Sequence, residues 1–139
     1  MIIRKAKKDD IKEVIKLTKI PELDNPKSGS NLESFKYFQE YMGKGIFLVA
    51  EEDGKIVGFI TGEFMLGSYI YIDVLSVDST LRGKGIGKDL VRNFEKLAKK
   101  KGVKFVHLTA PKFNKKTVKF YEKNGYDKGK EFFQFYKKL

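Results

Sequence analysis

The chain has 139 residues, a length that fits one domain, and 41% of them are hydrophobic, which is enough for a core. It contains no cysteine and a single histidine, which excludes disulfides, thiol nucleophiles and multi-histidine metal sites, so no metal is expected. The N-terminus lacks the apolar stretch of a signal peptide, and no apolar run reaches the ~20 residues that span a bilayer. We therefore expect a soluble, cytoplasmic protein without a membrane partner.

The formal net charge of +11 at pH 7 allows two interpretations. A basic protein attracts anions, and nucleic acid is one of them. The lysines are spread along the whole chain, from Lys5 to Lys138, which is typical of a solvated surface rather than of a concentrated nucleic-acid-binding arm. A nucleic-acid partner is therefore not expected, although a nucleic-acid-binding module stays an alternative.

The beginning of the chain is predicted to form a strand and two helices. The strand covers Ile2–Ala6, and a helix opens at Asp9–Asp10 and ends at Pro21. Turn-forming residues dominate Pro21–Asn31, which predicts a long loop. Aromatic residues on one side of the next segment predict a second helix, Leu32–Met42.

Three strands are predicted in the middle of the chain. The first two, Ile46–Glu51 and Ile56–Phe64, are joined by the turn EDGK and form a hairpin. The third, Tyr69–Val77, follows the turn MLGS. We expect these strands to pair in sequence order.

The last third alternates helices and strands. An amphipathic helix is predicted over about Lys84–Lys101, and the apolar strand Val103–Thr109 follows it. A helix of that length predicts a right-handed crossover, so this strand should lie parallel to Tyr69–Val77. A short helix, Asn114–Lys123, and a final strand, Phe132–Lys137, complete the prediction.

A glycine-rich segment separates the third strand of the middle group from the amphipathic helix. Its glycines occupy alternate positions and are interleaved with cations: Arg82, Gly83, Lys84, Gly85, Gly87 and Lys88. Amides at a helix N-terminus and the helix dipole both favour an anion, and glycines let a phosphate approach the backbone. The segment fits neither G-x-G-x-x-G nor the Walker loop G-x-x-x-x-G-K-[ST]. A simple turn is the plainer interpretation.

The segment does match the pattern [QR]-x-x-G-x-[GA], as Arg82-Gly83-Lys84-Gly85-Ile86-Gly87. It resembles the acetyl-CoA pyrophosphate loop of the GNAT superfamily of N-acetyltransferases. An apolar residue, Val77, lies five positions before the arginine. Downstream, NKKTVKFYEKNGY resembles the family's second motif, with Asn114, Tyr121 and then Gly125-Tyr126. The predicted order of elements over nearly all 139 residues is also that of the family.

This resemblance implies one GNAT-like α/β domain over residues 1–139. Its central twisted sheet would be mostly antiparallel, with one parallel pair between the fourth and fifth strands and helices on its flanks. It also implies acetyl-CoA as co-substrate, with the pantetheine arm on the backbone of the third middle strand and the pyrophosphate on the glycine loop. The implied binding residues are Leu75, Ser76, Val77, Arg82, Gly83, Lys84, Gly85, Ile86, Gly87, Lys88, Asn114 and Tyr121.

Two residues are candidates for proton transfer. The family motif puts Tyr121 beside the thioester sulfur, where it would protonate the departing thiolate, and the alternative is a core aromatic. Asp73 lies where polyamine-acetylating relatives carry a carboxylate that serves as base, and the alternative is an ordinary strand polar group. Thr109 stands where relatives that acetylate protein N-termini have a glutamate, which argues against their mechanism. The lone His107 is interpreted as structural.

The implied function is transfer of an acetyl group from acetyl-CoA to a primary amine by direct attack. Alternatives from other classes are a non-catalytic domain that binds acetyl-CoA and a nucleic-acid-binding domain of the same fold. Transfer of a longer acyl group is a variant of the main hypothesis. The sequence does not distinguish a small-molecule amine from a peptide amine, and it leaves a homodimer open.

Overall fold

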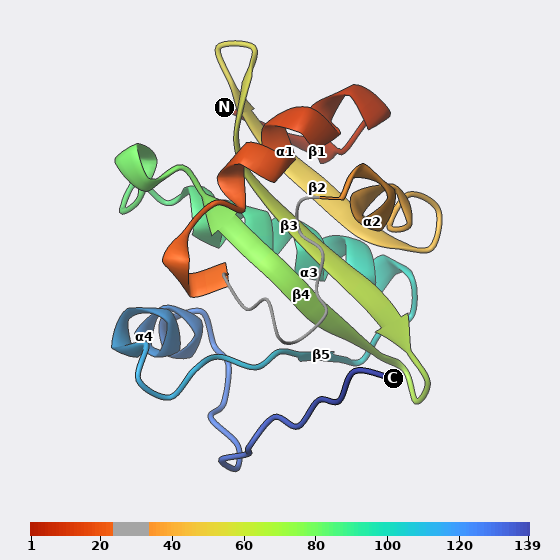
Figure 1. The fold of residues 1–139 in the computed structure, drawn as a ribbon, viewed down its shortest axis with the longest axis vertical. Helices are drawn as coiled ribbons and strands as arrows, with labels where there is room; N and C mark the ends of the chain where they lie inside the picture. The colour runs from red at the N-terminus through yellow and green to blue at the C-terminus, as the bar shows by residue number, and fades with distance from the viewer. Residues whose placement is uncertain (24–33) are drawn as a thin grey trace.

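A twisted five-stranded sheet forms the centre of the computed structural model, which describes residues 1–23 and 34–139 (Figure 1). The spatial order of the strands follows the chain, β1-β2-β3-β4-β5. Neighbours from β1 to β4 pair antiparallel, whereas β4 and β5 pair parallel, which confirms the predicted sheet. The strand bounds are β1 Ile2–Lys5, β2 Gly45–Glu52, β3 Lys55–Met65, β4 Tyr69–Val77 and β5 Phe105–His107.

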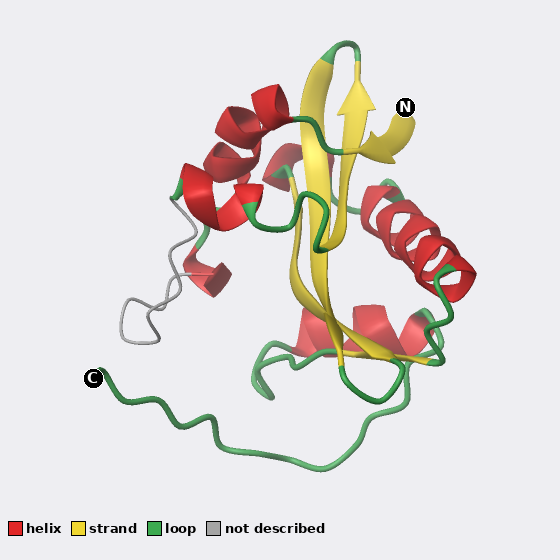
Figure 2. Ribbon diagram, turned by 90° about the vertical axis from the view of Figure 1, so that its right-hand side faces the viewer, coloured by secondary structure: helices red, strands yellow, loops and turns green. Residues whose placement is uncertain are grey.

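Helices cover both faces of this sheet. Figure 2 shows α1 and α2 on one face and α3 on the other. No helix in the described residues is long and apolar enough to cross a membrane. The helix bounds are α1 Ile11–Leu17, α2 Phe35–Gln39, α3 Ile86–Lys100 and α4 Lys115–Lys123.

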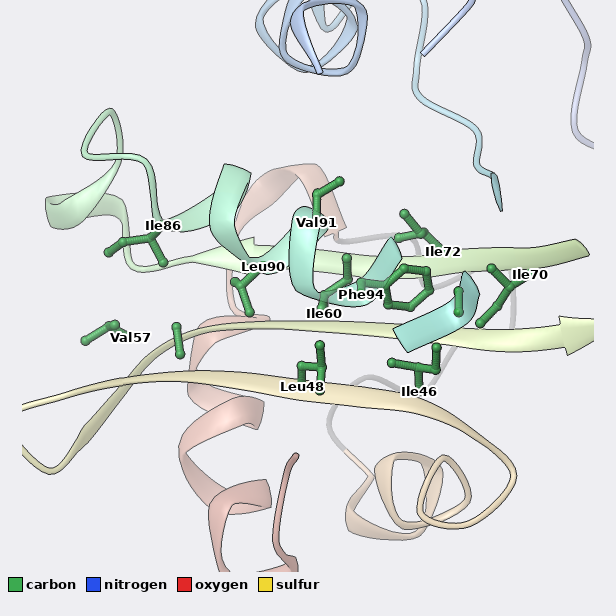
Figure 3. Packing of buried hydrophobic residues seen from close by; sticks show 12 residues of the cluster. Ile46, Leu48, Val57, Ile60, Ile70, Ile72, Ile86, Leu90, Val91 and Phe94 are labelled. Carbon is green, nitrogen blue, oxygen red and sulfur yellow. The ribbon is translucent and has the colours of Figure 1, made fainter. Parts of the chain in front are cut away.

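Alternating side chains of the strands divide the core into two clusters. On the α3 side, strand residues such as Ile46 and Ile60 meet the apolar stripe of α3, which includes Leu90 and Phe94 (Figure 3). On the other side, Phe38 of α2 and Val14 of α1 pack with strand residues. Successive strand residues point to opposite faces, so each strand serves both clusters. We call them the α3-side cluster and the α1/α2-side cluster.

An ion-pair network joins β1 to the start of α1. The Arg4 guanidinium donates to both oxygens of Asp10, at 2.7 and 2.9 Å, and its Nε donates to Glu51 of β2 at 2.6 Å. Asp10 also accepts the backbone N–H of Lys7 at 2.6 Å. The hydrogen bond from Arg4 lowers the pKa of Asp10. The helix predicted to open at Asp9–Asp10 begins after a 3-10 turn over Lys8–Asp10, at Ile11.

A β-bulge interrupts the pairing of β3 with β4. Thr61 pairs with Val74 across the ladder. The next residue of β3, Gly62, pairs with Ile72, so Asp73 has no partner on β3. The bulge changes the alternation of β4, because Ile72 belongs to the α3-side cluster and Val74 belongs to the α1/α2-side cluster.

Three predicted segments differ from the structure. The helix predicted over Leu32–Met42 is shorter, because α2 ends at Gln39 and turns follow; positions 32 and 33 lie outside the described residues. In the predicted loop Pro21–Asn31, Pro21–Leu23 form a 3-10 turn and the rest lies outside the described residues. The strand predicted over Val103–Thr109 is only three residues long, since the pairing with β4 ends at His107.

The prediction of a final strand over Phe132–Lys137 is wrong. The described residues that follow α4 form no strand, and Phe132, Phe133 and Phe135 are 81%, 89% and 92% exposed. A strand needs an edge with which to pair, and the last strand of the sheet, β5, spans only Phe105–His107. The aromatic content of the segment alone therefore did not determine the outcome here.

Close packing around Gly62, at the bulge, predicts that a larger residue there destabilises the protein. A Cβ at this position would lie 2.5 Å from Cζ of Phe94 and 2.8 Å from the carbonyl oxygen of Tyr71. We expect Gly62→Ala to lower the free energy of unfolding by about 1–3 kcal/mol, because the core has to shift. Urea unfolding measures this, with Gly129→Ala as control, since nothing lies within 4 Å of a Cβ there. Equal midpoints for the two variants would contradict the packing described here.

Candidate functional site

The two parallel strands separate after the first three residues of β4. Their pairing joins Tyr69 to Phe105, then continues for two more residues and ends at Tyr71. From there to Val77, β4 has β3 on one side and no described strand on the other. Figure 1 shows the chain after β5 diverging from β4. The open edge of β4 therefore offers its backbone to a ligand, as a sheet edge does for an added strand.

The side chains at this open edge are occupied by the fold itself. Ser76 points toward α1, where its hydroxyl donates to the carbonyl oxygen of Leu17 at 2.7 Å. Leu75 and Val77 pack against the α3-side cluster. If these predicted binding residues contact a ligand, they do so mainly through their backbone groups.

The glycine loop follows the end of β4 directly. Asp78 accepts the N–H of Thr80 at 2.9 Å and so fixes the turn that leads into the loop. Gly83 and Gly85 have φ of +80° and +88°, and a Cβ at either position would meet nothing within 4 Å. Glycine is thus favoured at these two positions by the left-handed backbone rather than by crowding.

Unpaired amides collect where the loop becomes α3. The first hydrogen bond of this turn runs from the N–H of Asp89 to the carbonyl oxygen of Gly85 at 3.0 Å, and no side chain caps the helix. The three preceding amides have no partner within the helix. They belong to Ile86, whose side chain is buried in the core, and to Gly87 and Lys88.

Positive charge surrounds these amides. Lys84 and Lys88 are exposed in the loop and in the first turn of α3. Arg82 is also exposed, and its Nε donates to the carbonyl oxygen of Val77 at 3.3 Å, which ties the loop to the end of β4. A hollow of about 350 Å³ lies beside Val77 and Asp78; its lining contains three lysines and also the acidic Glu13 and Asp78, and no residue of the loop. At the loop itself, the helix dipole and the exposed cations favour an anion.

Helix α4 approaches the start of α3 at Gly87. A Cβ at Gly87 would lie 3.4 Å from Cζ of Phe120, so this ring of α4 lies directly over the glycine. Asn114 caps α4, as its side-chain oxygen accepts the N–H of Thr117 at 3.3 Å. The predicted capping role of Asn114 is confirmed, and its contact with a cofactor stays a prediction.

Tyr121 lies half-buried on the inner side of α4. Its ring makes edge-to-face contacts with Phe120 and Tyr126, with centroid distances of 5.1 and 5.3 Å. Tyr126 donates its hydroxyl to Glu95 at 2.8 Å, whereas the Tyr121 hydroxyl has no hydrogen-bond partner among the described residues. Burial raises the pKa of Tyr121, so the group stays protonated and remains a donor.

Asp73, the bulged residue of β4, lies on the side of α2. Its Oδ2 accepts the hydroxyl of Tyr41 at 2.9 Å, and the Tyr41 oxygen lies 3.0 Å from that of Tyr37. Burial raises the pKa of Asp73 from 3.8 to about 6, while the hydrogen bond from Tyr41 opposes this and repulsion by Glu63 adds to it. A carboxylate that titrates near neutral pH is suited to accept and release protons.

The structure thus brings some predicted residues together and separates others. The glycine loop, the end of β4 and α4 meet, as Arg82 contacts Val77 and Gly87 lies under Phe120. Asp73 and Tyr121 instead approach β4 from different sides, since Tyr121 packs against the α3-side cluster.

Sequence reasoning did not identify Tyr37 and Tyr41 as residues of the candidate site. Their spacing of four predicts only that they share one helix face. No sequence signal links either of them to Asp73, which is 32 positions from Tyr41.

Two other residues singled out in the sequence have structural contacts. Thr109 lies 2.7 Å from the Tyr71 hydroxyl through its own hydroxyl oxygen. The His107 ring is exposed and stacks on Tyr69 with a centroid distance of 4.3 Å. Within residues 1–23 and 34–139, no group of three or more acidic or histidine side chains is placed to hold a metal.

Comparisons with known sequences agree with this geometry. The model of the acetyltransferase (GNAT) family matches residues 11–126. Over 129 residues the chain is 31% identical to an acetyltransferase of Pectobacterium atrosepticum, covering 91% of this chain and 88% of that protein. It is 33% identical over 129 residues to an acetyltransferase of Photorhabdus laumondii, covering 91% and 87%.

Solved structures share the fold. The chain is similar to an aminoglycoside acetyltransferase from an uncultured soil metagenomic sample, determined in complex with sisomicin. The TM-score is 0.78 at 22% identity, over 99% of this chain and 95% of that one. The matched family segment contains the glycine loop, the open part of β4 and all of α4. The chain therefore belongs to the acetyltransferase (GNAT) family.

Proposed function

We propose that this protein is an N-acetyltransferase that transfers an acetyl group from acetyl-CoA to a primary amine by direct attack. The observation that carries the proposal is the set of unpaired amides at the start of α3, placed directly after the open edge of β4. A diphosphate at these amides and an extended arm along β4 match the pyrophosphate and the pantetheine arm of a coenzyme A molecule.

Each part of the site has a task in holding acetyl-CoA. The backbone at Leu75, Ser76 and Val77 hydrogen-bonds the pantetheine arm, and Asn114 contacts the co-substrate from α4. The amides from Gly83 to Lys88 bind the pyrophosphate, with Arg82, Lys84 and Lys88 adding positive charge. The left-handed glycines keep these amides exposed, since no side chain covers them.

Proton transfers accompany the acetyl transfer. An amine of pKa ~10.4 is mostly protonated at neutral pH and cannot attack, so it first gives a proton to Asp73, directly or through water. The amine nitrogen then forms a bond to the acetyl carbon while the carbon–sulfur bond breaks, and Tyr121 donates its proton to the sulfur that leaves. The nitrogen loses its second proton to water as the amide forms, a proton from water restores the Tyr121 hydroxyl, and Asp73 releases its proton to solvent. Positioning of the two reactants supplies much of the remaining acceleration, ~7–11 kcal/mol in favourable cases.

The acceptor we propose is a small-molecule amine. The support is the fold shared with an aminoglycoside acetyltransferase that was crystallised with sisomicin. In addition, Thr109 occupies the position where relatives acting on protein N-termini have a glutamate, and its hydroxyl is engaged by Tyr71. A panel of amines with acetyl-CoA, scored by thiol release, tests this class against peptides with free N-termini.

Co-substrate binding tests the anion site separately from catalysis. We expect calorimetry to detect coenzyme A binding, and Lys88→Glu to weaken it about tenfold because the change puts negative charge beside the free amides. Lys96→Glu makes the same charge change on an exposed residue further along α3 and should bind like wild type. No heat with the wild-type protein would end the proposal. An equal loss in both variants would instead indicate a general charge effect.

Deleting one hydroxyl tests the general acid. Tyr121→Phe is expected to lower kcat about 10²-fold or more without abolishing turnover, and to leave the affinity for acetyl-CoA intact. Tyr126→Phe is the matched control, because it removes a hydroxyl from the same aromatic cluster but one that is bonded to Glu95. Steady-state kinetics measure kcat for both variants. If kcat falls by the same factor in both, the two tyrosines only support packing.

The pH dependence of the rate tests the base. Asp73 accepts a proton only when ionised, so kcat/KM of the wild-type protein should rise with pH through a midpoint of about 6. Asp73→Asn should lower kcat/KM and remove this step. In Glu63→Gln the midpoint should fall, because repulsion by Glu63 raises the pKa of Asp73. A step at about 6 that persists in Asp73→Asn would assign the titration to another group.

A further inference from the structure

A directional chain of hydrogen bonds ends on Asp73. The Tyr41 hydroxyl donates its only proton to Oδ2 of Asp73 at 2.9 Å. The Tyr41 oxygen also lies 3.0 Å from the hydroxyl oxygen of Tyr37. Because the proton of Tyr41 is already used, Tyr37 must be the donor in this second contact. The chain therefore runs from Tyr37 through Tyr41 to the carboxylate.

Aromatic packing holds this chain in place. The ring of Tyr41 makes edge-to-face contacts with Tyr37 and Phe47, at centroid distances of 5.6 and 6.2 Å. The ring of Tyr37 meets Phe38, which is fully buried, at 5.2 Å. The two tyrosine rings are thus fixed by the α1/α2-side cluster, and their hydroxyls have little freedom to leave Asp73.

The two carboxylate oxygens of Asp73 differ as a result. Oδ2 is engaged by Tyr41, whereas Oδ1 has no hydrogen-bond partner in the part of the chain that the structure describes. Asp73 is the extra residue of the bulge, so it has no pairing partner on β3, and bulges are frequent next to functional sites.

We propose that Tyr41 is a positioning residue for Asp73. Its hydroxyl holds Oδ2, so that Oδ1 faces the acceptor amine and takes its proton. This inference rests on the function proposed above. The proton leaves the ammonium nitrogen and binds Oδ1, the carboxyl becomes neutral, and the protons of Tyr41 and Tyr37 stay on their oxygens. Tyr37 in turn orients the Tyr41 hydroxyl.

Other charged groups around Asp73 set the direction of the expected pH effects. Glu63, on β3, disfavours the ionised carboxylate, whereas the hydroxyl of Tyr41, after α2, favours it. Glu40 and Glu63 act on Tyr37 and raise its pKa, although burial is the larger cause. Loss of the Tyr41 hydroxyl should therefore raise the pKa of Asp73, and loss of the Tyr37 hydroxyl should raise it less.

The direct test is titration of the Asp73 carboxyl carbon by NMR in the protein without ligands, with Asp73→Asn assigning the signal. We expect Tyr41→Phe to raise the midpoint by about one pH unit, since a hydrogen bond to a charged group is lost. Tyr37→Phe should move it in the same direction by less. Both changes keep the ring, so packing is preserved. An unmoved midpoint in Tyr41→Phe overturns the inference.

Kinetics separate this inference from the proposed function. In Tyr41→Phe we expect kcat to fall about tenfold with KM for acetyl-CoA unchanged, and the acidic limb of the pH profile to move up with the NMR midpoint. If no amine is acetylated, the proposed function fails while the titration still tests the positioning. If kcat in Tyr41→Phe equals that of wild type, Tyr41 has only a structural role. Should Tyr41→Phe fail to fold in thermal unfolding, Tyr37→Phe decides by the same two measurements.

Discussion

The bulge at Asp73 is the constraint on which the rest of the site depends. One extra residue in β4 moves every later side chain of the strand to the opposite face. Before the bulge, Ile70 and Ile72 fill the α3-side cluster, and after it Val74 and Ser76 face α1 and α2. The bulge also leaves Asp73 without a partner on β3, and its carboxylate accepts the hydroxyl of Tyr41. In a regular ladder, alternation would return Val74 to the α3 side.

A second constraint is the short pairing between β4 and β5. The crossover through α3 brings β5 back parallel to β4, but only three residues of each strand pair. Beyond them, the strand edge and the helix start present unpaired backbone groups close together. Buried backbone groups of this kind are costly unless they are paired, whereas exposed ones can bond to water or to a ligand. The candidate site is thus built from backbone rather than from a distinctive set of side chains.

Sequence patterns predicted the parts of the fold that depend on local periodicity and on glycine. The hairpin, the amphipathic helix α3 and the glycine-rich turn before it are visible in the residues themselves. The failures concern pairing partners. Phe132–Lys137 has strand composition, yet a strand exists only if a long enough edge receives it. The tyrosine chain to Asp73 joins segments 32 positions apart, and no local signal encodes such a meeting.

The hydrogen bond from Ser76 to Leu17 has a mechanical consequence. It fastens the last turn of α1 to the end of β4, where the strand has lost its parallel neighbour. Two residues 59 positions apart in the chain are therefore joined at the point where the helix ends and the open part of the strand runs out. The end of α1 cannot separate from the end of β4 without breaking this hydrogen bond, whose net contribution to stability is typically about 1 kcal/mol.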